Sequence, residues 1–343
     1  MSGYRLPAGG AIERDRPLSF RFDGRRCSGY AGDTLASALL AEGIIQVGRS
    51  FKYHRPRGIY SAGPEEPNAL VTLGADERTE PNTRATQIEL YDNLEARSQN
   101  RWPSLRLDLM ALNGLLSPLF VAGFYYKTFM WPARFWEPVY ERFIRKAAGL
   151  GRAGREPDPD VYDRHHAFCD VLVVGAGPAG LAAARSAAEA GADVLLVDER
   201  AWAGGQLAYE HETAAGRPAR DWIDDRVREL QGRDNVRLRL RTTAFGLYDG
   251  NVVGLIERVA DHQAPAPGQP RQRYWIVRPA QVVLATGAIE RPLSFAGNDR
   301  PGIMLAGAAR GYVNRFAVAP GRRVVVAAGH DDAYRAALDL RHA

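Results

Sequence analysis

The amino-terminal part of the chain alternates between strand-like and helix-like spacing of its apolar residues. Two strand-like runs, Leu18–Phe22 and Arg25–Ser28, flank Asp23-Gly24, a dipeptide typical of a two-residue hairpin turn. Thr34 precedes a helical apolar pattern and can cap that helix. A loop rich in Gly, Pro and Arg extends over Gly48–Pro67, and a further strand-like run follows it. This order of strand, helix and strand predicts a small β-grasp domain.

Beyond a boundary rich in Gly, Arg and Pro at 149–159, short apolar runs alternate with helical ones. We expect strands or helices over Asp170–Val174, Leu181–Ala190, Asp193–Val197, Asp221–Gln231, Val236–Arg241, Val282–Ala285 and Val324–Ala328. The runs Val252–Val259 and Tyr274–Val277 indicate two antiparallel strands, an excursion from the otherwise parallel pattern. Strands that alternate with helices are the signature of a parallel sheet, so the fold class is α/β.

The segment between these parts, from about Asn82 to Arg152, is rich in aromatic residues. They are Trp102, Phe120, Phe124, Tyr125, Tyr126, Phe129, Trp131, Phe135, Trp136, Tyr140 and Phe143. The longest apolar run, Leu115–Tyr126, is shorter than the about 20 residues that a membrane-spanning helix needs. The segment is either a linker packed on its own chain or a surface that a partner subunit buries. A role at a membrane surface is less favoured.

Composition narrows the classes of function. The chain has 343 residues, of which 45% are hydrophobic, and this length favours two or three domains. The formal net charge is +5, but the positive charge is almost entirely arginine and is spread along the chain, so nucleic acid is not expected as a partner. The first residues, Met1–Pro17, contain no apolar stretch of the kind a secretory signal has, and a cytoplasmic location is the default.

Cysteine usage limits the chemistry further. The chain has two cysteines, Cys27 and Cys169, which excludes a disulfide scaffold and a four-cysteine iron–sulfur or zinc site made by this chain alone. The adjacent His165 and His166 have no acidic or cysteine cluster placed to complete a site, and no nucleophile–base pair is apparent. We therefore expect no metal and no catalytic side chain.

The strongest chemical signal is the run Asp170-Val-Leu-Val-Val-Gly175-Ala-Gly177-Pro178-Ala179-Gly180. An apolar strand leads into it, an Ala-rich helix follows it, and a second apolar strand ends at Asp198-Glu199, which is the full context of a dinucleotide-binding unit. The first glycine permits the tight turn, the second lets a pyrophosphate approach the backbone, and the third lets the helix pack on the sheet. The helix amino terminus attracts phosphate. Asp198 or Glu199 would bind the adenosine ribose and disfavour a 2′-phosphate.

Two later segments extend this predicted site. Gly205 and Gln206 lie in a Gly-rich loop of the kind that lines a dinucleotide, and Thr286-Gly287 follows an apolar strand, as in flavoproteins with two dinucleotide domains. A tight turn is the alternative interpretation of Thr286 and Gly287. After the strand expected at Val324–Ala328, the second and third glycines are missing, so we expect no standard pyridine-nucleotide site there.

The chain resembles the alpha-subunit family of heterotetrameric sarcosine oxidases over essentially its full length. The resemblance is carried by Gly32–Leu40, by Gly48–Gly58, by Gly175–Gly180 with Asp198–Arg200, and by Ala285–Pro292. It implies an FAD/NAD(P)-binding Rossmann-like domain of the two-dinucleotide flavoprotein type, preceded by a ferredoxin-like β-grasp domain. The implied parts are the β-grasp domain over 1–81, a helical linker or subunit interface over 82–165, and the nucleotide-binding domain over 166–343.

The resemblance also implies an activity and its ligands. In this family the complex oxidises sarcosine to glycine with oxygen and tetrahydrofolate, and the alpha subunit works with beta, gamma and delta subunits. The alpha subunit holds NAD⁺ that takes no part in turnover. By motif position, the NAD⁺ contacts are Ala179, Asp198, Glu199, Arg200, Gln206 and Ala244, with Gln206 in the place of a threonine.

The β-grasp domain resembles plant-type ferredoxins, in which a Cys-rich loop holds a [2Fe–2S] cluster. The corresponding loop, Gly48–Pro67, has no cysteine, so we expect no iron–sulfur cluster and a domain that serves as a scaffold. The basic residues of the loop contact either an anionic cofactor or an acidic partner, or they belong to a solvated loop that its prolines anchor. They are Arg49, Lys52, His54, Arg55 and Arg57.

The family pattern continues beyond Ala343 into the rest of the nucleotide domain and a folate-binding domain. The resemblance therefore implies a truncated chain that lacks part of its NAD⁺ pocket. Two other functions remain open. One is a subunit of a flavin-dependent dehydrogenase for another secondary amine or an opine, with FAD bound at Gly175–Gly180 through the same adenosine diphosphate. The other is a non-enzymatic assembly component that its dinucleotide only stabilises.

Overall fold

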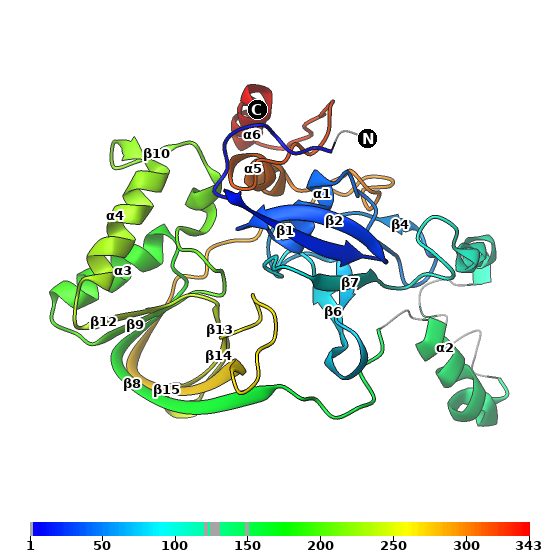
Figure 1. The fold of residues 1–343 in the computed structure, drawn as a ribbon, viewed down its shortest axis with the longest axis horizontal. Helices are drawn as coiled ribbons and strands as arrows, with labels where there is room; N and C mark the ends of the chain where they lie inside the picture. Colours follow the sequence, from blue (N-terminus) through cyan, green and yellow to red (C-terminus); the bar gives the residue numbers. More distant parts are fainter. Residues whose placement is uncertain (1–2, 120–122, 124–130, 148–150) are drawn as a thin grey trace.

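The computed structural model describes residues 3–119, 123, 131–147 and 151–343. Two larger sheets dominate it, a five-stranded sheet near the amino terminus and a six-stranded sheet that curves around the opposite side of the molecule (Figure 1). The segment that carries α2 (Arg142–Ala147) projects from the edge of the first sheet. The mixed strand and helix content agrees with the predicted α/β class.

The first sheet has the order β2-β1-β7-β5-β6, with β1 and β7 parallel at its centre. Its strands are β1 (Glu13–Phe22), β2 (Arg25–Ala31), β5 (Leu70–Leu73), β6 (Glu80–Arg84) and β7 (Leu94–Ser98). The hairpin expected at Asp23-Gly24 is confirmed, because Phe22 pairs with Arg25 across the turn. The sheet extends to Ser98, beyond residue 81, while the proposed division into three domains stays a prediction.

Helix α1 (Leu35–Ala41) is buried along its whole length against this sheet. Thr34 caps it through a capping box: its side chain accepts the Ser37 amide hydrogen, and the Ser37 hydroxyl accepts the Thr34 amide hydrogen. The apolar helical pattern thus supplies the core of a β-grasp domain, as the sequence predicts. The short strands β3 (Gly48–Arg49) and β4 (Pro56–Arg57) pair within the following loop.

The second sheet has the order β12-β9-β8-β15-β14-β13. Its strands are β8 (Val161–Val174), β9 (Val194–Val197), β12 (Val236–Arg239), β13 (Thr242–Tyr248), β14 (Val252–Arg258) and β15 (Pro270–Leu284). The first four in spatial order are parallel, and β14 and β13 continue antiparallel, which confirms the predicted excursion. Helices α3 (Pro178–Glu189) and α4 (Ala219–Gln231) pack on one face of the sheet. The short strands β10 (Thr213–Ala214) and β11 (Arg217–Pro218) precede α4.

The carboxy-terminal helices add to the packing of the β-grasp domain. Helix α5 (Ala306–Asn314) and the residues after it enter the core of the β-grasp domain, with Tyr312 and Phe316 buried there (Figure 1). Helix α6 (Asp332–His342) packs on α5. The strand predicted at Val324–Ala328 is wrong: among the described residues this run pairs with no strand, and Val325 is 93% exposed. A strand needs a neighbour for its backbone groups, and local propensity does not provide one.

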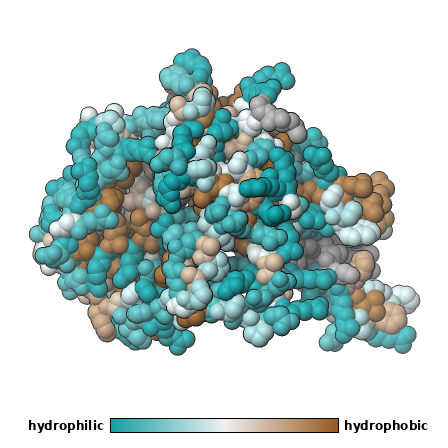
Figure 2. Space-filling model, in the orientation of Figure 1, coloured by the Kyte–Doolittle hydropathy of each residue, from teal (hydrophilic) through white to brown (hydrophobic). Residues whose placement is uncertain are grey.

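Beyond β7, the described residues of the aromatic segment form short turns and helices. These helices are η2 (Leu109–Leu119), η4 (Ala133–Phe135), η5 (Trp136–Glu141) and α2. Phe120, Phe124, Tyr125, Tyr126 and Phe129 lie outside the described residues. Trp102, Trp131 and Phe143 are exposed, and Figure 2 shows apolar residues gathered at this edge of the molecule. A search of the described helices finds none that could cross a membrane.

Candidate dinucleotide-binding site

The turn from β8 into α3 is built around glycines that no other residue can replace without movement. Gly175 has a φ of +103°, and a Cβ built on it would lie 2.3 Å from the Ala285 carbonyl oxygen. A Cβ on Gly180 would lie 1.7 Å from the Gly175 carbonyl oxygen. The predicted roles of these two glycines in the tight turn and the close packing of the helix therefore have a direct steric cause.

Gly177 differs from these two glycines, because a Cβ built on it would make an ordinary van der Waals contact and no clash. It adopts an extended conformation as the N-cap of α3, Pro178 follows at the first helical position, and no side chain caps the helix. A Cβ on Gly177 would approach only the Gly205 Cα, at 3.9 Å. The two glycine backbones thus pack directly against each other, since a Cβ on Gly205 would lie 3.0 Å from the Gly177 Cα, and we call this pair of backbones the glycine strip. Beside this strip the first amides of α3, those of Ala179 and Gly180, are free of side-chain caps, which fits a pyrophosphate.

The two acidic residues after β9 differ in what they contact. Asp198 accepts the Ala176 amide hydrogen at 2.7 Å and the Arg200 amide hydrogen at 2.8 Å, so both of its oxygens hold the turn together. The Glu199 carboxylate has no side-chain hydrogen bond within the described part of the chain. Burial raises the pKa of Glu199, and the nearby Arg200 and Arg258 oppose that rise. Glu199 is therefore the carboxylate available to a ribose, a distinction that the sequence left open.

The structure brings three further predicted positions to this turn. The backbone of Thr286 passes 3.3 Å from a Cβ built on Gly175, and Gly287, with a φ of +73°, follows it. Gly205 begins the short helix η6 (Gly205–Tyr209) opposite Gly177. The Gln206 side chain reaches the start of α5, since a Cβ on Gly307 would lie 3.0 Å from its Nε2 atom.

Ala244 lies in β13, further along the sheet. Thr242, two residues earlier, donates its amide hydrogen to the Asp198 carbonyl at 2.7 Å. Ala244 itself packs at the edge of the buried cluster beneath β8 and β9. A backbone hydrogen bond thus connects β13 to the acidic segment, Asp198-Glu199. The direct contact of Ala244 with a nucleotide stays a prediction.

Two arginines that sequence analysis missed lie directly behind the acidic segment. The Arg241 side chain makes two hydrogen bonds to the Glu89 carboxylate of the β-grasp domain, at 2.7 and 2.6 Å. The Arg258 guanidinium donates to the Gln87 carbonyl at 2.8 Å and to the Glu199 carbonyl at 2.5 Å. A small pocket of about 30 Å³ marks this junction between the domains. Their partners in the β-grasp domain lie more than 150 positions away, so no local pattern could have indicated these contacts.

The basic loop beside the β-grasp sheet is largely paired within the chain. Arg49 donates to the Leu105 carbonyl and lies 3.4 Å from Asp108, which also contacts the His54 Nδ1 atom at 2.7 Å. Arg55 and Arg57 both pair with Asp299. These contacts favour the interpretation of an anchored loop over that of a free anion-binding surface.

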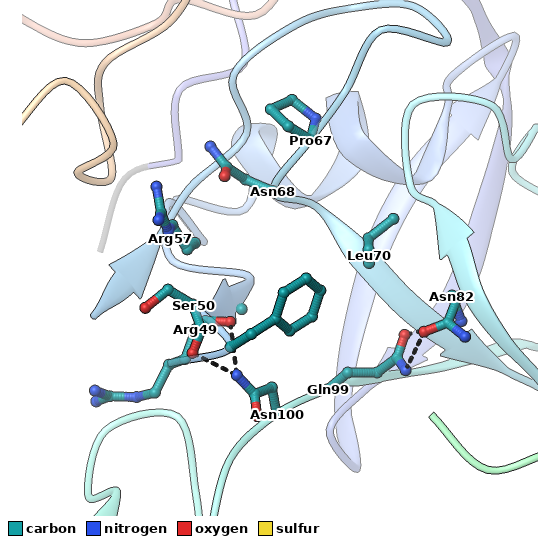
Figure 3. Close-up of a pocket in the computed structure, with 11 residues that line it drawn as sticks. Arg49, Ser50, Arg57, Pro67, Asn68, Leu70, Asn82, Gln99 and Asn100 are labelled. Carbon is teal, nitrogen blue, oxygen red and sulfur yellow. Dashed lines mark hydrogen bonds between the residues drawn. The ribbon is translucent and has the colours of Figure 1, made fainter. Parts of the chain in front are cut away.

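The pocket enclosed by this loop is small and lined by amides. Asn100 donates to the carbonyls of Arg49 and Ser50, and Gln99 contacts Asn82 across the floor (Figure 3). Its volume is about 90 Å³, below the several hundred Å³ of a typical cofactor pocket.

The residues of the β-grasp domain do not fit an iron–sulfur cluster. Cys27 lies in β2 and Cys169 in β8, in different sheets, and both are buried. Burial raises the pKa of each thiol to about 11, so both thiols are protonated at neutral pH. Among the described residues, no group of three His, Cys or acidic side chains is arranged to hold a metal ion.

Comparisons with known protein families match two separate parts of the chain. Residues 15–101 match the family described as a 2Fe-2S iron-sulfur cluster binding domain. Residues 170–246 match the family described as FAD dependent oxidoreductase. The fold and the site thus define a chain with a ferredoxin-like domain followed by a domain of the flavin- or nucleotide-binding type.

The more particular relationship comes from whole proteins. The chain is 59% identical over its full length to the alpha subunit of the sarcosine oxidase of Rhizobium meliloti (strain 1021), and it covers 35% of that protein. It is 41% identical to the corresponding protein of Corynebacterium sp. (strain U-96), with 97% of this chain and 30% of the relative covered. The chain is therefore a homologue of sarcosine oxidase alpha subunits and corresponds to their amino-terminal portion. It spans about a third of the length of these relatives.

Two more distant similarities support the fold. One of the opine oxidase subunits of Agrobacterium tumefaciens (strain Ach5) is 35% identical over 173 residues, with 46% of this chain and 32% of the relative covered. The crystal structure of L-proline dehydrogenase from P. horikoshii superposes with a TM-score of 0.65 at 21% identity, over 98% of this chain and 54% of that chain. The latter similarity bears on the fold alone.

Proposed function

We propose that this chain is the nucleotide-binding part of the alpha subunit in a sarcosine oxidase complex and binds NAD⁺ without using it in turnover. The complex would oxidise sarcosine to glycine with oxygen and tetrahydrofolate, with beta, gamma and delta subunits as partners. The observation that carries the proposal is the amino end of α3, which no side chain caps, beside the glycine strip of Gly177 and Gly205. The relationship to sarcosine oxidase alpha subunits at 59% identity supports the choice of complex.

In this proposal the residues of the chain hold the nucleotide and do no chemistry on a substrate. The amides of Ala179 and Gly180 would bind the pyrophosphate, and Glu199 would accept hydrogen bonds from the adenosine ribose. Arg200, Gln206, Ala244 and Thr286-Gly287 are proposed to complete the surroundings of the nucleotide. Bound in this way, NAD⁺ contributes binding energy to the folded state rather than a hydride to the reaction.

A second function has its own support. The match to an FAD dependent oxidoreductase family over residues 170–246 and the similarity to an opine oxidase favour FAD at the same turn, in a dehydrogenase for another secondary amine or an opine. Both nucleotides contain adenosine diphosphate, and the glycine strip accepts either.

The identity of the bound nucleotide separates the two functions. The full chain is purified, its absorbance is recorded, and NAD⁺ and FAD are titrated in parallel by calorimetry. We expect no flavin absorbance at about 450 nm and saturable binding of NAD⁺. A flavin that copurifies in stoichiometric amount would overturn the NAD⁺ proposal in favour of FAD. Co-expression with candidate beta, gamma and delta subunits then tests the complex, because sarcosine-dependent oxygen consumption requires their assembly.

A further inference from the structure

The segment that would bind the ribose is held from behind by two arginines, Arg241 and Arg258. The Arg241 amide donates to the Arg200 carbonyl at 2.8 Å, and the Arg258 guanidinium donates to the Glu199 carbonyl at 2.5 Å. The two arginines also contact each other, because the Arg258 amide donates to the Arg241 carbonyl at 2.9 Å. The position of Glu199 therefore depends on the conformation of this pair.

The same two side chains reach the β-grasp domain. Arg241 binds the Glu89 carboxylate with two hydrogen bonds, and Arg258 binds the Gln87 carbonyl. These partners are fixed within their own domain, since the Ile88 carbonyl between them accepts the Leu35 amide hydrogen at the start of α1. Each arginine thus has one contact with the segment proposed to bind the ribose and one with residues 87–89, which are bonded to the amino end of α1 through Ile88.

A third contact fixes the next residues of the same loop. Trp202 packs against the core of the β-grasp domain, and the Arg315 guanidinium lies 3.7 Å above its ring. The segment from Glu199 to Trp202 is therefore held by contacts with both domains. The conformation of this segment depends on both domains. A ligand that binds this conformation therefore also favours the arrangement in which the β-grasp domain is docked on the nucleotide-binding domain.

We infer that Arg241 and Arg258 couple dinucleotide binding to docking of the β-grasp domain, with Arg258 as the positioning residue for Glu199. This inference rests on the proposed nucleotide site and adds a role for the β-grasp domain, which holds the nucleotide site in its binding conformation. Linkage requires the effect to be reciprocal, so that bound nucleotide stabilises the interface between the domains.

The test uses the full chain and two variants. Arg258→Met keeps the apolar part of the side chain and removes the donors to Gln87 and Glu199. Arg78→Met is the matched control, since Arg78 pairs with Asp160 across the same interface at 2.9 Å but touches no residue of the nucleotide site. We expect Arg258→Met to raise the Kd for NAD⁺ about tenfold or more, and Arg78→Met to leave it within about twofold. Arg258→Lys, which keeps the charge but presents a single ammonium, should be intermediate.

Hydrogen exchange of the wild-type chain with and without NAD⁺ provides a second measurement that does not depend on the variants. NAD⁺ should slow exchange at residues 85–90 of the β-grasp domain as well as at 175–200. Protection confined to 175–200, or an unchanged Kd in a folded Arg258→Met variant, overturns the coupling while leaving the nucleotide site intact. Absence of any binding of NAD⁺ or FAD to the wild-type chain overturns the proposed site itself, and the coupling with it.

Discussion

The hydroxyl of Tyr312 donates a 2.7 Å hydrogen bond to the backbone carbonyl of Ser61, which lies 251 positions earlier in the chain. Both residues are fully buried, so no water can replace this bond when it is lost. The contact attaches α5, which follows the nucleotide-binding segments in sequence, to the core of the β-grasp domain.

Replacement of Tyr312 by Phe should therefore destabilise the whole molecule rather than one domain. Phe preserves the packing but leaves the Ser61 carbonyl without its donor, and we expect a loss of about 1–3 kcal/mol in the free energy of unfolding. Chemical denaturation monitored by circular dichroism measures the loss. Tyr334→Phe, at an exposed position of α6, is the control and should change the free energy by less than about 0.5 kcal/mol. Equal stability of the Tyr312 variant and the wild type would show that the bond contributes nothing.

The glycines of the β8–α3 turn should separate binding from folding. Gly177→Ala places a methyl group at an ordinary contact distance of 3.9 Å from the Gly205 Cα, so the melting temperature should be unchanged and the affinity for NAD⁺ should fall at least about tenfold. Gly180→Ala forces a methyl group against the Gly175 carbonyl, and we expect a loss of stability of about 1–3 kcal/mol. Calorimetry and thermal denaturation of both variants check the contrast. An unchanged affinity in Gly177→Ala would place the pyrophosphate elsewhere.

Glu199 should show opposite effects on stability and binding. Because burial raises its pKa in the folded chain above the ordinary value of 4.5, the ionised carboxylate opposes folding at neutral pH. The free energy of unfolding should therefore rise as the pH falls through the raised pKa of Glu199 toward 4.5, because the carboxylate becomes protonated. Glu199→Gln should therefore have a higher melting temperature than the wild type at pH 7, and the difference should shrink toward pH 5. The same substitution should weaken NAD⁺ binding, because an amide is a poorer acceptor for ribose hydroxyls than a carboxylate.

The melting temperatures of the two proteins at a series of pH values provide the measurement for this prediction. Glu77→Gln, on the surface of the β-grasp domain, is a suitable control and should give parallel curves. A Glu199→Gln variant that is less stable than the wild type at pH 7 contradicts the argument from burial.

The two cysteines should be unreactive in the folded chain. Their pKa values of about 11 leave almost no thiolate at pH 7, and both side chains are at least 90% buried. Iodoacetamide at pH 7 should therefore label neither Cys27 nor Cys169 in the native chain and both after denaturation, as mass spectrometry would record. The same preparation should contain no iron or acid-labile sulfide. Stoichiometric iron would contradict a cluster-free β-grasp domain.

Local features of this fold were predictable from the sequence, and contacts between distant segments were not. The hairpin at Asp23-Gly24 and the cap at Thr34 depend on neighbouring residues, and each forms as expected. The choice of Glu199 over Asp198 required the structure, because the Asp198 oxygens are occupied by amides of the turn itself. The run at Val324–Ala328 has strand propensity but no pairing partner in the described part of the chain, and pairing decides whether a strand forms.

Long-range contacts explain the remaining differences. The contacts of Arg258 with Gln87 and of Tyr312 with Ser61 join segments that have no common sequence pattern. The sequence predicted that most of the chain beyond residue 165 would form a separate nucleotide domain. In the structure, the core of the β-grasp domain includes residues from 305 to 318.

The contrasting surroundings of the tryptophans provide two optical reporters within one chain. Trp131 and Trp102 are 84% and 59% exposed on the aromatic segment, whereas Trp202 is enclosed at the junction of the domains beneath Arg315. Exposed indoles emit at longer wavelengths than buried ones and are readily quenched by iodide. A blue shift of the quenchable emission would report that another protein covers the aromatic segment. A change confined to the unquenched emission would report events around the buried tryptophans, which include Trp275 in β15 as well as Trp202.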